Sequence, residues 1–237
     1  MSGFKQGLAV CVLAGGRGSR LAPLTESVPK PMVRIEGKPF LQILMEHFAS
    51  LGYRRFVLAV GYPREQIREF FGDGRSFGWK VSYSVEPRPL GTGGAVSWAQ
   101  PMWGDRAIVV NGDTYIAEDW RRLAAVHDAS GLPATMAVVR ADNCERFGRV
   151  RVEGNRVTDL KEKADVPGAG WINAGVYVVD SEVFACYPRG RSFSLERDVF
   201  PALAGRIGAF FCAGAFTDIG TPDVLQRFRE HAATNSK

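Results

Sequence analysis

A short apolar strand followed at once by a cluster of glycines constrains the fold of this chain more than any other feature. Residues 8–13 are apolar and include two valines, which is typical of a strand buried in a parallel sheet. Residues 14–18 read Ala-Gly-Gly-Arg-Gly, a composition that lets backbone N–H groups turn tightly around an anion. Arg17, Arg20 and Lys30 add positive charge to the same segment. The segment therefore predicts a polyphosphate-binding loop after the first strand of an α/β fold.

Two common phosphate-binding loops do not fit this spacing. A Walker A loop carries Lys-Ser or Lys-Thr directly after its last glycine, and that pair does not occur here. A dinucleotide fingerprint built on Gly16 and Gly18 requires a third glycine where Leu21 stands. An ordinary glycine-rich turn with scattered surface charge is the structural alternative. The continuation to Pro29-Lys30-Pro31-Met32 argues against that alternative.

Strands and helices alternate through the first half of the chain. The predicted strands are 8–13, 55–61, 80–86 and 106–110, and the predicted helices are 39–51, 64–71, 93–100 and 118–129. This order predicts an α/β fold with a Rossmann-like, mostly parallel sheet that carries helices on both faces.

Strands joined by turns predominate in the second half. The predicted strands are 134–140, 148–152, 156–161, 171–179 and 207–216, and the predicted helices are 195–203 and 222–231. Glu153-Gly154-Asn155 is typical of a hairpin connection. We interpret residues 1–237 as a single domain. Its first half, about 1–130, carries the predicted polyphosphate-binding loop, and its second half, about 131–237, is a smaller mixed lobe that covers the open edge.

Charge and composition narrow the class of partner. The net charge is +5 and the pI is near 9.2, which favours anionic ligands. Basic residues alternate with acidic ones and form no aromatic-rich basic run, so we expect small phosphorylated ligands and no nucleic acid.

The remaining compositional signals concern compartment and metal chemistry. The four cysteines include no Cys-x-x-Cys pair, which favours free thiols in a reducing compartment. We see no signal sequence and no apolar run long enough to cross a bilayer, so we expect a cytoplasmic protein without a membrane partner. His47, His127 and His231 are isolated, so a histidine-based zinc site or nucleophile is not expected.

Four segments of glycine and polar residues follow the predicted carboxyl ends of strands, where open α/β sheets bind ligands. They are the glycine loop, residues 86–94, Asn111-Gly112-Asp113 and Thr217-Asp218-Ile219-Gly220. Asp113 and Asp218 supply the hard oxygen ligands that magnesium prefers. The alternative is that each aspartate caps a following helix. The pair together favours a Mg2+ site.

The order of these motifs resembles that of the sugar-1-phosphate nucleotidylyltransferases, which make nucleotide sugars. The resemblance extends from residue 8 to about residue 222. It implies four catalytic residues. These are Arg17, Lys30, Asp113 and Asp218, with Mg2+ held by the two aspartates. The implied reaction is attack by a sugar-1-phosphate oxygen on the α-phosphorus of a nucleoside triphosphate. Since the nucleophile is already ionised, catalysis consists of alignment and charge neutralisation.

The resemblance also implies a nucleotide-binding set. Its members are Leu13, Ala14, Gly15, Gly16, Gly18, Glu86, Gly91, Thr92 and Gly93. Glycines in the Gly91-Thr92-Gly93-Gly94 loop would allow the backbone to approach base and ribose. Glu86 accepts hydrogen bonds only, and guanine offers adjacent N1–H and N2–H donors, whereas uracil and thymine do not. The alternative is an ordinary surface glutamate.

The implied sugar-phosphate-binding residues are Gly148, Glu162, Lys163, Asn173 and Glu196. The resemblance therefore makes residues 1–130 the nucleotide-binding half and residues 131–237 the sugar-phosphate-binding half, both in approximate bounds. Ala164 follows Glu162-Lys163 where the family normally has proline, a departure that affects the shape of this loop. Residues 192–198 also fit a helix cap.

Among short members, the 86–94 loop and Ser194-Leu195-Glu196 are most similar to D-glycero-D-manno-heptose 1-phosphate guanylyltransferases. That likeness implies coupling of the heptose phosphate to GTP, with a GDP-sugar and pyrophosphate as products. Mannose-1-phosphate guanylyltransferase and uridylyl- or thymidylyltransferases acting on a hexose 1-phosphate remain alternatives. A non-catalytic, nucleotide-sugar-sensing regulatory subunit is another, although it has no need of all four catalytic residues. The oligomeric state stays open, with a homo-oligomer among the options.

Overall fold

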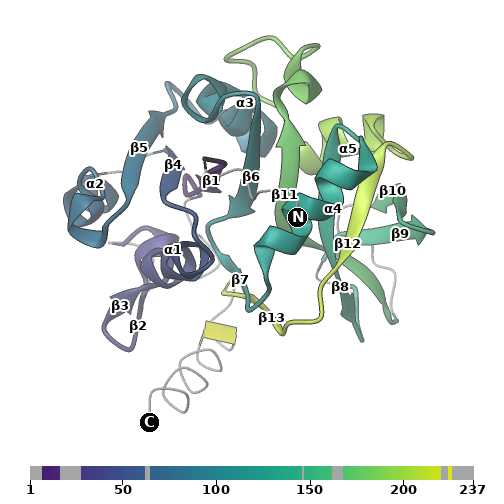
Figure 1. Ribbon diagram of the computed structural model, residues 1–237, viewed down its shortest axis with the longest axis horizontal. Coiled ribbons are helices and arrows are strands. Elements are labelled where there is room, and N and C mark those ends of the chain that lie inside the picture. Colours follow the sequence, from purple (N-terminus) through teal and green to yellow (C-terminus); the bar gives the residue numbers. More distant parts are fainter. Residues whose placement is uncertain are drawn as a thin grey trace.

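A nine-stranded mixed sheet forms the centre of the computed structural model, which describes residues 7–16, 28–61, 65–145, 147–161, 168–219 and 224–225 (Figure 1). In spatial order its strands are β5 (Lys80–Val85), β4 (Arg55–Val60), β1 (Ala9–Leu13), β6 (Arg106–Asn111), β11 (Gly170–Asp180), β8 (Ala134–Ala141), β12 (Ile207–Phe211), β10 (Arg156–Lys161) and β9 (Arg149–Glu153). The first four strands are mutually parallel. The predicted fold class is confirmed.

Helices cover both faces of the sheet. They are α1 (Phe40–Ser50), α2 (Glu65–Phe71), α3 (Gly91–Trp103) and α4 (Trp120–Ser130). On β1, Val10 and Val12 pack in one core with side chains of α1, α2 and α4, while Ala9 and Cys11 pack in another with α3. Because successive strand residues point to opposite faces, a strand covered on both sides is apolar throughout, as the sequence of β1 is.

The second half of the chain continues the same sheet. β11 lies antiparallel to both β6 and β8, and β12 pairs parallel to β8. β9 and β10 form the predicted hairpin, and the first residues of β11, Trp171 and Ile172, also pair with β9. The strands β11, β8, β12, β10 and β9 therefore close on one another beside the parallel half.

Several elements differ from the prediction. The predicted strand 207–216 is two strands, because the chain leaves the large sheet after β12 and forms β13 (Phe216–Asp218). β13 pairs antiparallel with β7 (Thr114–Ile116), a strand that the sequence did not indicate. The predicted helix 195–203 is a π-helical turn, Leu195–Val199, followed by α5 (Phe200–Ala202), where Pro201 lacks an N–H to extend the turn. The helix predicted at 222–231 lies almost wholly outside the described residues.

Shorter elements complete the chain. They are η2 (Lys30–Met32), β2 (Arg34–Ile35), β3 (Lys38–Pro39), η3 (Arg75–Phe77) and η4 (Ser181–Phe184). The helix α3 also begins two residues before its predicted start and continues past Pro101 to Trp103.

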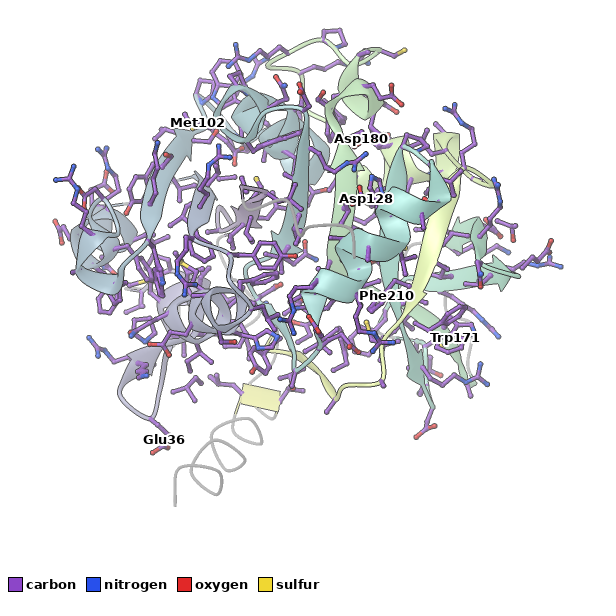
Figure 2. The ribbon with its side chains drawn as sticks, viewed as in Figure 1. Glu36, Met102, Asp128, Trp171, Asp180 and Phe210 are labelled. Carbon is purple, nitrogen blue, oxygen red and sulfur yellow. The ribbon has the colours of Figure 1, made fainter. Side chains whose placement is uncertain are left out.

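A cluster of polar side chains lies at the starts of β6 and β8, around Arg106 and Thr135. The ring of His127 contacts the hydroxyl of Thr135 and, at 3.4 Å, the carboxylate of Asp180, and burial lowers the pKa of this histidine. Arg106 bridges Asp180 and Asp128, which lie close together in Figure 2.

The cysteines are free thiols, and burial raises the pKa of Cys11 to about 12. Within the described part of the chain, no helix is both long and apolar enough to cross a membrane.

Candidate active site

A cavity of about 680 Å3 opens where β1, β4, β5 and β6 end. Eight residues predicted as catalytic or nucleotide-binding line it, namely Leu13, Gly15, Gly16, Lys30, Glu86, Gly91, Thr92 and Asp113. Parallel strands bring their carboxyl ends to one edge, so segments separated by up to a hundred residues contribute to one wall.

Close backbone packing shapes the floor of this cavity. The N–H of Gly112 donates to the carbonyl oxygen of Leu13 at 3.0 Å, and a Cβ at Gly112 would lie 2.7 Å from that oxygen. A Cβ at Gly15 would lie 3.0 Å from both the Glu86 carboxylate and the Gly61 nitrogen. Glycine is therefore needed at 112 and strongly favoured at 15, because the strand ends approach one another too closely for a side chain.

Asp113 and Asp218 converge on the ammonium group of Lys30. The Lys30 Nζ lies 2.5 Å from Asp113 Oδ2 and 3.7 Å from Asp218 Oδ1, and only 8% of the lysine side chain is exposed. The β7–β13 pairing produces this arrangement, since it sets Asp218 opposite Thr114 and lets the N–H of Ile219 donate to the Asp113 carbonyl. Asp218 therefore lies within a strand, where the sequence had suggested a position after one.

The pair of carboxylates fits a divalent cation that completes its coordination with substrate phosphates. The helix-cap alternative for Asp113 is wrong, because Asp119 caps α4 by accepting from the N–H of Arg121. Among the described residues, no group of three or more His, Cys, Asp or Glu side chains gathers as a self-sufficient metal cage. Mg2+ held by two carboxylates ordinarily takes its further ligands from substrate phosphates and water.

Glu86 is half-buried, not an ordinary surface glutamate, and lines the cavity. Its Oε2 accepts from the backbone N–H of Leu90 at 2.8 Å, which holds the loop between β5 and α3. Burial raises the pKa of the Glu86 carboxyl, and the Leu90 hydrogen bond opposes that rise.

The glycines at the start of α3 approach another part of the protein. The N–H groups of Gly93 and Gly94 donate to the Phe193 carbonyl at 3.0 and 3.1 Å, and a Cβ at Gly93 would lie 2.4 Å from the Phe193 ring. Gly91 has φ +70°, and a Cβ there would lie 2.6 Å from the same carbonyl oxygen. The sequence predicted that these glycines let the backbone approach the base and ribose of a nucleotide. In the structure, residues 191–194 are what approaches them closely, although Gly91 and Thr92 still line the cavity.

Two groups of hydrogen bonds hold the predicted sugar-side residues: one links Thr92 to Glu196, and the other links Asn173 to Tyr177 and Gly148. The Thr92 hydroxyl donates to Glu196 at 2.7 Å. Ser194 caps the π-helical turn and lies within the segment 192–198 that was predicted to cap a helix. The Asn173 amide donates to the Tyr177 hydroxyl at 2.7 Å, and the Asn173 N–H donates to the carbonyl of Gly148. Gly148 and Asn173 are therefore adjacent.

Four predicted site residues cannot be placed. Arg17, Gly18, Glu162 and Lys163 lie outside the described residues, so their roles stay predictions.

No individual role was predicted for two side chains of this region, although Asn111 belongs to a segment expected at the ligand-binding edge. Asn111 lines the cavity, and its amide lies where a side chain on Gly175 would be, 2.7 Å from the position of a Cβ. The position of Asn111 beside Gly112-Asp113 at the end of a strand could have indicated that it lines the cavity. Tyr177 carried none, because a tyrosine within an apolar strand is ordinary until its buried hydroxyl is located.

Comparisons with known proteins support a common ancestry with one family. The chain matches the family described as nucleotidyl transferase over residues 9–235. It is 34% identical over 215 residues to the D-glycero-alpha-D-manno-heptose 1-phosphate guanylyltransferase of Aneurinibacillus thermoaerophilus, covering 90% of this chain and 93% of that protein. It is 38% identical over 222 residues to the mannose-1-phosphate guanylyltransferase of Mycobacterium tuberculosis, covering 91% of this chain and 62% of that protein. The chain thus spans less than two thirds of the mycobacterial relative.

Solved structures share the fold. HddC from Yersinia pseudotuberculosis complexed with GMP-PN superposes with a TM-score of 0.83 at 33% identity, covering 95% of this chain and 99% of that one. A putative glucose-1-phosphate thymidylyltransferase from Bacillus anthracis, in complex with a sucrose, gives a TM-score of 0.86 at 25% identity, with 95% of each chain covered.

Proposed function

Because the chain belongs to the nucleotidyl transferase family, we propose that it couples a sugar 1-phosphate to GTP and releases pyrophosphate. The observation that carries this proposal is the convergence of Lys30, Asp113 and Asp218 beside the cavity at the strand ends. A phosphate oxygen of the sugar 1-phosphate forms a bond to the α-phosphorus of GTP. The bond from that phosphorus to the bridging oxygen breaks, and pyrophosphate leaves with the electron pair.

Asp113 and Asp218 are the residues that would hold Mg2+, which when bound neutralises the phosphate charge that builds up during transfer. Lys30 contributes a fixed positive charge at the same place, and its burial keeps that charge poorly screened by water. No protein base is needed, because the attacking phosphate oxygen is already ionised.

GTP is the proposed nucleotide because Glu86 is a carboxylate on the cavity wall. One hydrogen bond to Leu90 leaves the carboxylate with acceptor capacity for the N1–H and N2–H donors of guanine. A pyrimidine carbonyl facing Glu86 would leave the carbonyl oxygen and the Glu86 carboxylate without a hydrogen-bond donor. A site built to hydrogen-bond one base strongly rejects a base that lacks the matching donors.

D-glycero-D-manno-heptose 1-phosphate is the proposed sugar substrate. Two proteins named as guanylyltransferases for its alpha anomer match this chain along nearly their whole length, 93% and 96%. The likeness to the mycobacterial enzyme favours mannose 1-phosphate as the second candidate. We further propose a reducing, cytoplasmic location, which suits the free thiols.

Pyrophosphate release over four nucleoside triphosphates and several sugar 1-phosphates tests the proposal. We expect the highest kcat/KM with GTP and the heptose 1-phosphate. Higher efficiency with mannose 1-phosphate would replace the sugar assignment, and equal use of UTP or dTTP would remove the basis for guanine recognition. A protein that binds nucleotide sugars without turnover would be the regulatory alternative.

Glu86→Gln tests the base assignment directly. It exchanges one acceptor oxygen for an NH2 group, so the preference for GTP over UTP should narrow, mainly through loss of GTP use. Glu118→Gln is the matched control, because the Glu118 carboxylate also accepts backbone N–H groups, from Asp119 and Ala213, but does not line the cavity. Its GTP preference should equal that of the wild type.

A further inference from the structure

A buried carboxylate holds the chain at the break between β12 and β13. After β12, the N–H of Cys212 still donates to the carbonyl of Val138 in β8, at 2.9 Å. The next N–H, that of Ala213, donates instead to Oε2 of Glu118 at 3.0 Å. Glu118 lies two residues after β7, the strand with which β13 pairs (Figure 1). The carboxylate therefore binds the chain where it leaves the large sheet, beside the strand that it joins next.

Glu118 is itself fixed from several sides. Only 6% of its side chain is exposed, and its Oε1 accepts from the backbone N–H of Asp119 at 3.0 Å and from the guanidinium of Arg122 at 3.3 Å. Arg122 also lies over the ring of Phe210 in β12, 5.7 Å from its centroid. The backbone carbonyl oxygen of Glu118 lies 2.9 Å from Nε2 of His47 in α1. The carboxylate is a fixed anchor, because rotating it would break hydrogen bonds from separate segments of the chain.

The segment after this anchor leads directly to the proposed metal ligand. A Cβ at Gly214 would lie 2.6 Å from the carbonyl oxygen of Ala117, so the chain passes the end of β7 at a distance that favours glycine. β13 then pairs with β7, and Asp218 Oδ1 lies 3.7 Å from Nζ of Lys30. Four residues separate the anchored Ala213 from Asp218. A shift at the anchor is therefore transmitted over a short stretch of extended chain.

We propose that Glu118 is a positioning residue for the metal site, because its hold on the start of β13 places the Asp218 carboxylate beside Asp113. This inference rests on the proposed function, in which the two aspartates hold Mg2+. The other end of β13 is held within the site, since the N–H of Ile219 donates to the Asp113 carbonyl at 3.0 Å. Asp218 thus lies on a short strand that is held at both ends, and Glu118 holds the end outside the cavity.

Glu118→Gln is tested against Asp119→Ala. Two donors, on Asp119 and Arg122, share Oε1, so the single oxygen of glutamine is favoured there and its NH2 group faces the Ala213 N–H. The anchor of β13 is then lost while the side-chain shape is kept. Asp119→Ala removes the side-chain cap of α4, next to Glu118, and leaves the hydrogen bond to Ala213 in place. Both variants should lower Tm, so loss of stability alone does not distinguish them.

Two measurements separate positioning from destabilisation. The first is Mn2+ binding to the metal-free protein, followed through the electron paramagnetic resonance signal of free Mn2+, because this ion prefers carboxylates as Mg2+ does. Glu118→Gln should raise the dissociation constant about tenfold, as loss of a group that orients a metal ligand does, and Asp119→Ala less than about twofold. The second is the half-saturating Mg2+ concentration for pyrophosphate release, which should rise by a similar factor in Glu118→Gln alone. The preference of that variant for GTP over UTP should stay that of the wild type.

A double variant tests whether Glu118 acts through Asp218. In an Asp218→Asn background, Glu118→Gln should weaken Mn2+ binding little further, because the ligand that it positions is already lost. Should Glu118→Gln fail to fold, Gly214→Ala displaces the same segment and should weaken Mn2+ binding in its place. Equal Mn2+ and Mg2+ constants in Glu118→Gln and Asp119→Ala, or an equal effect of Glu118→Gln with and without Asp218, would overturn the inference. A wild type that neither binds Mn2+ nor releases pyrophosphate would instead overturn the proposed function.

Discussion

Replacing Lys30 with methionine removes one buried positive charge and keeps most of the side-chain volume. The two aspartates on either side of Nζ have 32% and 28% of their side chains exposed, so water recovers part of the lost interaction. A hydrogen bond between charged groups contributes roughly 1.5–3 kcal/mol. We expect the free energy of unfolding in the absence of metal to fall by about 2 kcal/mol.

The effect on catalysis should be larger than the effect on stability. Negative charge at the α-phosphate is redistributed during transfer, so a fixed ammonium group acts mainly on the transition state. Removal of one such electrostatic group costs about 3–4 kcal/mol, or roughly two to three orders of magnitude in kcat. The KM for GTP should rise far less.

Two assays measure these effects, urea denaturation without metal and steady-state pyrophosphate release with saturating Mg2+. Lys38→Met is the matched control, since Lys38 pairs with Glu46 at 3.0 Å on the surface, where 54% of the lysine side chain is exposed. That variant should lose less than about 1 kcal/mol and keep its kcat. A Lys30→Met enzyme with kcat within about fivefold of wild type would refute the catalytic role. A large increase in KM at unchanged kcat would make Lys30 a ground-state anchor.

Further variants test the metal, the packing of α3 and the response to acid. Asp113→Asn should lower kcat by about two to three orders of magnitude while the circular dichroism spectrum stays native; activity within a few-fold of wild type in saturating Mg2+ contradicts a metal ligand at this position. Gly93→Ala should lower Tm by about 2–10 °C, because its Cβ would lie 2.4 Å from the Phe193 ring; an unchanged Tm in a thermal melt would show that the ring moves away freely. Burial lowers the pKa of His127, so the unfolded chain takes up this proton more readily, and stability should fall as pH drops below about 6.5. Urea midpoints at about pH 7.5 and 5.5 should therefore differ less in His127→Gln than in wild type; an equal difference assigns the acid sensitivity to other groups.

The parallel half of the fold could be predicted because its signals are local. The predicted strand 106–110 and the helix 39–51 match β6 and α1 to within a residue at each end. Burial on both faces makes a strand apolar throughout, and the 3.6-residue period marks a helix packed on one side. Since polar residues directly after parallel strands must share one sheet edge, the sequence also located much of the cavity wall, including Glu86 and Asp113.

The partners of the site residues depend on chain segments far apart in sequence. Asp218 meets Lys30 and Asp113 because β13 leaves the large sheet and pairs with β7. Gly214 lies at that break, but a single glycine does not identify the strand that β13 joins. The glycines at 91–94 predicted a tight approach, but only the tertiary structure shows residues 191–194 as the segment that comes close.

Tyr177 shows most clearly what local sequence determines and what only the tertiary structure determines. Its sequence neighbours determine that it lies in a strand, since apolar and β-branched residues surround it. Its hydroxyl accepts a hydrogen bond from Asn173 of the same strand, whereas only the fold brings Glu196, a residue of the later π-helical turn, near it. Local sequence determines backbone conformation through sterics and hydrophobic period, whereas side-chain partners depend on contacts between distant segments, which form only when the chain folds.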